Sequence, residues 1–148
     1  MSTNLDNITL MEMLDAAAAE GLGPLVVSGF RTQKTQQSLY EDKIAEYRKK
    51  GYDEEEAKRL AGEWVAVPGT SEHQLGLAVD INGAVYDVYL WLQANSYKYG
   101  FIFRYPGNKV DITGVQQEVW HYRYVGVEAA TAIYEQGICL EEYLENLE

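Results

Sequence analysis

Four short apolar runs constrain the fold of this chain more than any other feature. They are LVVSG at 25–29, LAVDI at 77–81, FIFRY at 101–105 and VWHYRYV at 119–125. Valines in the first run predict a buried strand, and the aromatic and β-branched bias of the others is typical of strands. Because the strands cluster in the second half of the chain with helical segments on both flanks, we expect an α+β fold with a small antiparallel sheet.

The segments around these runs carry helix signals. Thr9 and Glu12 form a capping box for a helix that closes at Gly21. The segment 32–50 contains no Gly or Pro and ends in basic residues, and Asp53 is placed to cap the next helix. Later helices are predicted over 84–95, 126–137 and 140–147, and a loop over 65–76.

Length and composition limit the class of protein. A chain of 148 residues with 47% hydrophobic residues predicts one domain, 1–148, with a packed core. A net charge of −11 repels phosphate backbones, so we expect no nucleic-acid partner.

The single cysteine, Cys139, excludes an internal disulfide and a Cys-rich metal site, and we expect a buried thiol. The sequence has no membrane-length apolar run and no N-terminal signal pattern, which leaves a cytosolic protein or a domain whose export signal lies elsewhere.

The chain has only two histidines, and each lies near a carboxylate. His73 precedes Asp80 by seven residues, so on one regular strand the two side chains would face opposite ways. They can converge if the chain turns at Gly76. Glu118 and His121 are also an odd number of positions apart, so on a regular strand they too would face opposite ways. We therefore expect the segment that holds them to be irregular at its start.

Two imidazoles and one carboxylate are a suitable set of protein ligands for a catalytic zinc that keeps a fourth position open. On this interpretation His73, Asp80 and His121 bind the metal, and Glu118 accepts a proton from water. The alternative is a pair of hydrogen-bonded, half-buried histidines. Glu72 is a competing carboxylate, although its position beside His73 predicts that it points away.

Several segments resemble one known family. SEHQLGLAVDI is similar to the S-x-H-x-x-G-x-A-x-D signature of the zinc D-alanyl-D-alanine carboxypeptidases, the vancomycin-resistance-type branch of the LAS metallopeptidases. EVWHYRYVG resembles the E-P-W-H-[YW]-R-[YF]-V-G segment of that family, with Val119 in place of its proline. SGFRTQKTQQSLY, NSYKYGFIFRYP and the final LEEYL match in the same order.

The resemblance implies a LAS-type fold, a Zn²⁺ cofactor and a site in which His73, Asp80 and His121 bind the metal and Glu118 activates water. It also implies that Arg31 contacts the substrate or the developing oxyanion, and that Gln36 and Ser71 line the substrate cleft. From the residues alone, Arg31 could merely pair with an acid, Ser71 could cap its turn and Gln36 could face water.

The expected activity is that of a monomeric metallocarboxypeptidase that removes the C-terminal D-alanine from a peptidoglycan stem peptide at the cell wall. Two enzyme alternatives remain, an L,D-carboxypeptidase acting on the tetrapeptide stem and an endopeptidase. A further alternative is a zinc-holding module that binds wall peptide without cleaving it. Retention of Glu118 argues against that module, since a pure binder needs no base.

Overall fold

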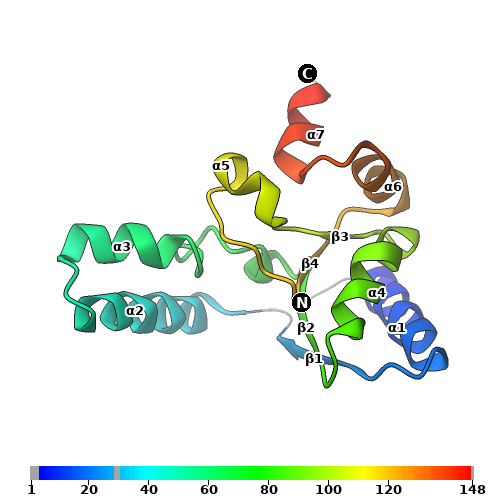
Figure 1. Cartoon of the computed structure of the whole chain (residues 1–148), viewed down its shortest axis with the longest axis horizontal. Helices are drawn as coiled ribbons and strands as arrows, with labels where there is room; N and C mark the ends of the chain where they lie inside the picture. The colour runs from blue at the N-terminus through cyan, green and yellow to red at the C-terminus, as the bar shows by residue number, and fades with distance from the viewer. Residues whose placement is uncertain (1–3, 29–30, 148) are drawn as a thin grey trace.

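A four-stranded antiparallel sheet forms the centre of the computed structural model, which describes residues 4–28 and 31–147 (Figure 1). The strands lie in the order β1-β2-β4-β3. Their bounds are β1 Pro24–Ser28, β2 Ala78–Gly83, β3 Phe101–Phe103 and β4 His121–Tyr124. The α+β class and the antiparallel sheet are therefore confirmed, although the FIFRY strand stops at Phe103.

The helices surround this sheet. The α-helices are α1 Asn4–Ala19, α2 Gln33–Lys49, α3 Glu54–Gly62, α4 Asp87–Asn95, α5 Val110–Thr113, α6 Val127–Gln136 and α7 Leu140–Asn146. Three 3-10 turns are η1 Glu72–Leu75, η2 Ser96–Tyr99 and η3 Gly107–Lys109. In the described part of the chain no helix has both the length and the hydropathy needed to cross a membrane.

Two predictions about the first elements were wrong. The helix predicted to start at Thr9 extends back to Asn4, because no Gly or Pro interrupts the residues before the capping-box pattern. The first strand was expected to be buried, yet Leu25 is 64% and Val27 52% exposed. The reason is packing, since β1 pairs with β2 at the edge of the sheet and its side chains lie outside the main core, whereas the other edge strand, β3, contributes Phe101 to that core.

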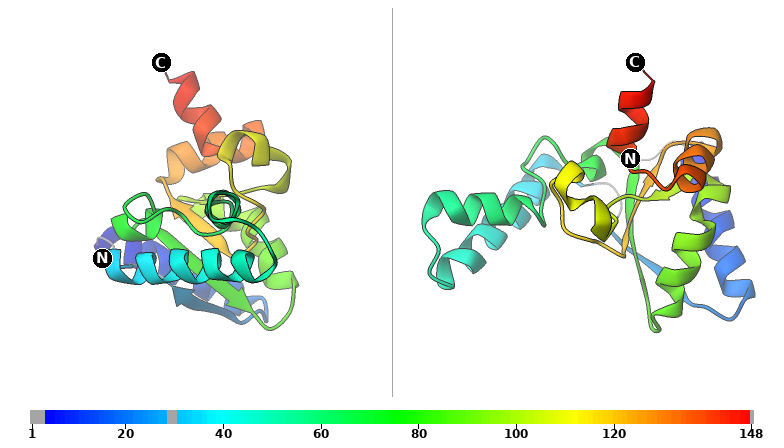
Figure 2. Two further views of the ribbon diagram at one scale, coloured as in Figure 1. Left: turned by 90° about the vertical axis from the view of Figure 1, so that its left-hand side faces the viewer. Right: turned by 45° about the horizontal axis from the view of Figure 1, so that its top comes forward.

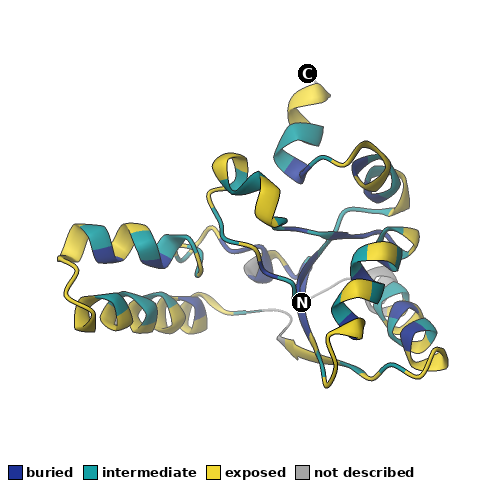
Figure 3. Cartoon of the chain, viewed as in Figure 1, coloured by how far each residue is buried: buried dark blue, intermediate teal, exposed yellow. Residues whose placement is uncertain are grey.

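Helices α2 and α3 pack against each other as a hairpin that projects from the sheet (Figures 1 and 2). Thr32 caps α2 by accepting a hydrogen bond from the Thr35 N–H, and Asp53 caps α3 in the same way from Glu56. Most of the hairpin's surface is exposed, whereas the central strands are buried (Figure 3).

The two faces of the sheet differ in chemistry. Cross-strand neighbours point to the same face, and Val79 lies opposite Tyr122 while Asp80 lies opposite His121. The first pair joins the main core, in which strand residues pack against α1 and α4; its buried members are Met13, Val79, Ile81, Val88, Leu92, Phe101 and Tyr122. The second pair lies on the opposite face, which carries the functional groups described next.

Candidate active site

Local backbone structure brings the two histidines and Asp80 together. His73 lies in η1, where the Ser71 hydroxyl accepts a hydrogen bond from the His73 N–H at 3.2 Å. Gly76 ends η1 with φ of 72°, a left-handed conformation that glycine adopts at little cost, and the chain then enters β2. The turn expected at Gly76 is confirmed.

His121 is the first residue of β4 and pairs with Asp80 across the two strands. The segment before it is irregular, as the parity of Glu118 and His121 predicted, and the His121 N–H donates to the Glu118 carbonyl. The Val119 carbonyl, at the position of the family proline, accepts a hydrogen bond from the Tyr122 hydroxyl at 3.0 Å.

One oxygen of Asp80 lies between the two imidazoles. Asp80 Oδ1 is 3.1 Å from His73 Nε2 and 3.2 Å from His121 Nδ1. Ligands about 2.1 Å from a tetrahedral zinc are roughly 3.4 Å apart, so these two spacings are close to those of ligands that share one ion. The three residues are buried, and their ligand atoms lie within 4.8 Å of one another.

Burial and hydrogen bonding shift the acidities of this trio. Burial alone would raise the pKa of Asp80, but hydrogen bonds from His121 and His73 outweigh it and lower that pKa well below its usual range. For His121, burial favours the neutral ring, whereas bonds to Asp80 and Glu72 favour the charged ring and raise the pKa to about 8. The carboxylate is therefore ionised, as a metal ligand must be.

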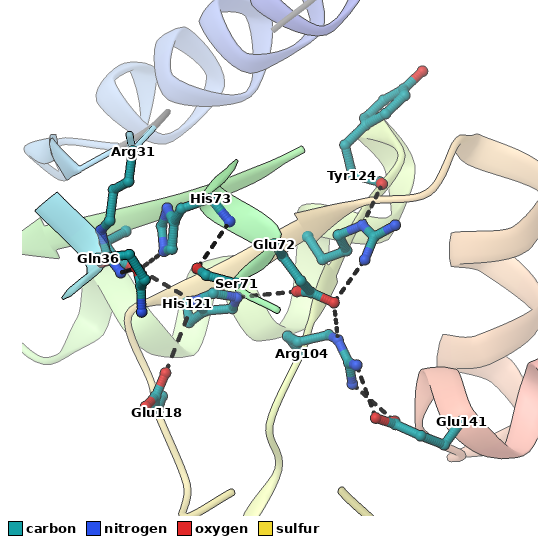
Figure 4. Close-up of polar contacts among 12 residues, drawn as sticks. Arg31, Gln36, Ser71, Glu72, His73, Arg104, Glu118, His121, Tyr124 and Glu141 are labelled. Atoms are coloured by element: carbon teal, nitrogen blue, oxygen red, sulfur yellow. Dashed lines mark hydrogen bonds and ion pairs between the residues drawn. The ribbon is translucent and has the colours of Figure 1, made fainter. Parts of the chain in front are cut away.

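Arg31 contacts the second oxygen of Asp80. Its Nη2 donates to Asp80 Oδ2 at 2.7 Å, and its Nη1 donates to Gln36 Oε1 at 3.3 Å (Figure 4). Gln36 is completely buried, and its amide nitrogen donates to the Ala66 carbonyl at 2.8 Å. In this structure Gln36 lies behind Arg31 and supports the guanidinium, while Arg31 itself lines the cavity.

Glu118 faces the same site without belonging to the trio. Its carboxylate is 3.8 Å from His121 Nδ1 and is buried. Burial is the main reason that the pKa of Glu118 rises to about 7; the nearby Asp80 charge raises it further, and His121 and Arg31 oppose the shift. A carboxylate with this pKa can both accept and release a proton near neutral pH.

Sequence reasoning missed the role of Glu72. We expected this residue to point away, but it is buried, lines the same cavity and contacts His121 on the nitrogen opposite Asp80, with Oε1 3.2 Å from Nε2. Arg104 and Arg123 both donate to its Oε2. The available signal was the pair of arginines within the apolar FIFRY and HYRYV strands, because charges buried in a sheet need a partner.

A cavity of about 580 Å³ opens onto this cluster. Its lining includes His73, Asp80, His121, Arg31, Ser71 and Glu118. Tyr47 on α2 and Trp64, just after α3, also line it, so the cavity reaches the α2–α3 hairpin. The site therefore has room for an extended ligand.

Comparison with known proteins identifies the family. The sequence profile described as "VanY: D-alanyl-D-alanine carboxypeptidase" matches residues 6–127. A "D-alanyl-D-alanine carboxypeptidase" of Enterococcus faecalis (strain ATCC 700802 / V583) is 59% identical over 140 residues, which cover 91% of this chain and 52% of that protein. The chain spans about half the length of the curated relatives it matches.

Two solved structures have the same fold. A mutant of the vancomycin resistance D,D-pentapeptidase VanY from a VanB-type resistance cassette, in complex with Zn(II), is 56% identical with a TM-score of 0.92 and covers 97% of this chain and 83% of that one. VanYB in complex with D-alanine-D-alanine is 55% identical with a TM-score of 0.96 and covers 99% and 84% of the two chains.

Proposed function

Because the chain belongs to the VanY family of D-alanyl-D-alanine carboxypeptidases, we propose that it is a zinc-dependent enzyme that removes the C-terminal D-alanine from peptidoglycan stem peptides. The observation that carries this proposal is the buried His73–Asp80–His121 trio with Glu118 beside it at the head of one cavity. A Zn(II) complex and a D-alanine-D-alanine complex of similar proteins support it.

In this proposal zinc would be held by His73 Nε2, Asp80 Oδ1 and His121 Nδ1, in which the carboxylate oxygen lies 3.1 and 3.2 Å from the two ring nitrogens. When bound, zinc supplies Lewis acidity toward the scissile carbonyl and toward water. The chain's own residues carry the proton transfer and bind the developing charge.

Glu118 acts as the general base and then as the general acid. It accepts a proton from the attacking water and delivers it to the amine of the leaving D-alanine. A buried carboxylate beside the cluster suits both steps, because its ionised form accepts the proton and its conjugate acid releases it.

Arg31 is proposed to bind negative charge on the substrate, either on the tetrahedral oxyanion or on the terminal carboxylate. Its guanidinium is held in place by Asp80 and Gln36, which limits the reorganisation needed when substrate binds. Gln36 would thus contribute to substrate binding through Arg31, whereas Ser71 lines the cavity directly.

The chain is proposed to act as a single catalytic domain over 1–148 and as a monomer. Its place of action would be the cell wall, outside the cytoplasm, where stem peptides ending in D-alanine occur. The part of the cavity that reaches the α2–α3 hairpin would accommodate the peptide that precedes the scissile bond.

The test is to incubate the zinc-loaded protein with stem pentapeptide and with stem tetrapeptide in separate reactions. We expect D-alanine and the tetrapeptide from the pentapeptide, with much slower conversion of the tetrapeptide. Faster cleavage of the tetrapeptide would instead establish an L,D-carboxypeptidase.

Glu118→Gln is the matched control. It should keep zinc and bind the pentapeptide, while release of D-alanine falls roughly 10²–10⁴-fold, the usual contribution of general acid–base catalysis. A wild-type protein that binds the pentapeptide yet releases nothing would be a recognition module, and normal cleavage by Glu118→Gln would place the base elsewhere.

A further inference from the structure

The imidazole of His121 lies between two buried carboxylates. Asp80 Oδ1 is 3.2 Å from Nδ1 on one side, and Glu72 Oε1 is 3.2 Å from Nε2 on the other. A neutral imidazole has one N–H and one lone pair, so one nitrogen donates a hydrogen bond and the other is available to a metal. The groups around the ring determine which of its two nitrogens carries the proton.

Glu72 is held by two arginines as an ionised acceptor. Arg104 Nε and Arg123 Nη1 donate to its Oε2 at 2.7 and 2.6 Å. Two guanidinium groups that donate to one oxygen require the ionised form of the carboxylate. An ionised carboxylate cannot donate, so its free oxygen can only accept the proton of His121 Nε2.

The hydrogen bonds behind His121 extend to helix α7. Both terminal nitrogens of Arg104 donate to Glu141 on α7 at 2.8 Å, a bidentate pair that orients the guanidinium toward Glu72 (Figure 4). The LEEYL ending, the arginine after β3 and the arginine in β4 are thereby joined in one network behind His121.

We propose that Glu72 is a positioning residue that fixes the tautomer and the ring orientation of His121, so that Nδ1 is offered to the metal shared with His73 and Asp80. This inference rests on the proposed function for the assignment of the metal site. Glu72 does not replace Asp80 as a ligand, because the two carboxylates lie against opposite nitrogens of the same ring. Outer carboxylates of this kind are a general means of orienting ligand histidines.

The wild-type protein provides the first test, by nitrogen-15 NMR of the zinc-loaded chain. With only two histidines, both rings can be assigned. We expect His121 to be metal-bound at Nδ1 with a protected proton on Nε2, and His73 to be metal-bound at Nε2. A proton on Nδ1 of His121 would overturn the proposal.

Glu72→Gln provides the second test. Arg104 and Arg123 can only donate hydrogen bonds, so they should bind the oxygen of the glutamine amide. The NH₂ group of the amide would then face His121. That group can only donate to Nε2, which moves the ring proton to Nδ1 and blocks the metal. We expect zinc affinity, measured by competition with a chelating dye, to fall roughly 10–100-fold.

Glu141→Gln is the matched control, because it weakens the same network without touching His121. Its zinc affinity should stay within about threefold of wild type. Equal losses in the two variants, or wild-type affinity in Glu72→Gln, would contradict the proposal. If Glu72→Gln does not fold, the wild-type spectrum decides alone.

The outcome is separable from that of the proposed function. The expected spectrum in a protein that releases no D-alanine would refute the function and leave the role of Glu72 intact. Active protein with His121 bound through Nε2 would refute the role of Glu72 alone. A chain that binds no zinc would contradict both.

Discussion

On the face of the sheet that packs against α1 and α4, Val79, Ile81 and Tyr122 form an apolar core, whereas on the other face Asp80 and His121 line a cavity. The same two strands supply both sets of residues, alternating one by one along β2 and β4. The core face stabilises the strands, and the cavity face carries buried carboxylates, imidazoles and arginines that are costly to bury. Mutations on the two faces should therefore affect different measurements.

The largest effect is expected from removing a proposed metal ligand on the cavity face. His73→Ala and His121→Ala should each lose most of the bound zinc, and release of D-alanine should fall to background, because three ligands are needed to hold the ion. Metal analysis of the purified variants checks this. Full zinc occupancy in both variants would show that the ligand assignment is wrong.

Leu92→Ala makes the complementary change in the core, on the helix α4 that covers the apolar face of the sheet. Leu92 is completely buried, and its truncation should lower the free energy of unfolding by about 2–5 kcal/mol. Urea unfolding at 25 °C measures this loss. The kcat/KM of the fraction that remains folded should equal that of wild type, and a large fall would mean that the two faces are coupled.

Arg31→Ala should keep the zinc and lower kcat/KM by roughly 10²-fold, the scale for a donor aimed at developing charge. Arg31→Lys should restore only part of the activity, because an ammonium cannot bridge Asp80 and Gln36 as the planar guanidinium does. Steady-state kinetics on the pentapeptide decide between this role and a purely structural ion pair with Asp80, for which wild-type kinetics are expected.

The smallest effect is expected for the stability of the metal-free protein, which Glu118→Gln should increase at high pH. In the metal-free protein the pKa of Glu118 is about 7 in the folded state and near 4.5 in the unfolded chain. The folded state thus binds more protons between these values, and stability falls as pH rises from about 4.5 to 7.

Glu118→Gln removes that loss, so at pH 8 the variant should be roughly 1–2 kcal/mol more stable than wild type, since each pKa unit corresponds to about 1.4 kcal/mol and neighbouring groups relax. At pH 4 the two proteins should differ little. Thermal unfolding in the presence of a chelator measures both, and a lower melting temperature for the variant at pH 8 would contradict the assigned cause.

Local signals in the sequence determined much of this protein. The cap at Asp53, the turn at Gly76 and the irregular start of the strand at His121 follow from neighbouring residues and strand parity. The two histidine motifs likewise predicted the cluster of His73, Asp80 and His121.

Only the tertiary structure decided the rest. The exposure of β1 and the roles of Glu72 and Gln36 depend on what packs against each of them. Glu72 contacts His121 across 49 residues of sequence, and Arg104 contacts Glu141 across 37. A local pattern can state that a buried charge needs a partner, but the partner is chosen by which strands and helices pack together, and that choice is made by the whole chain at once.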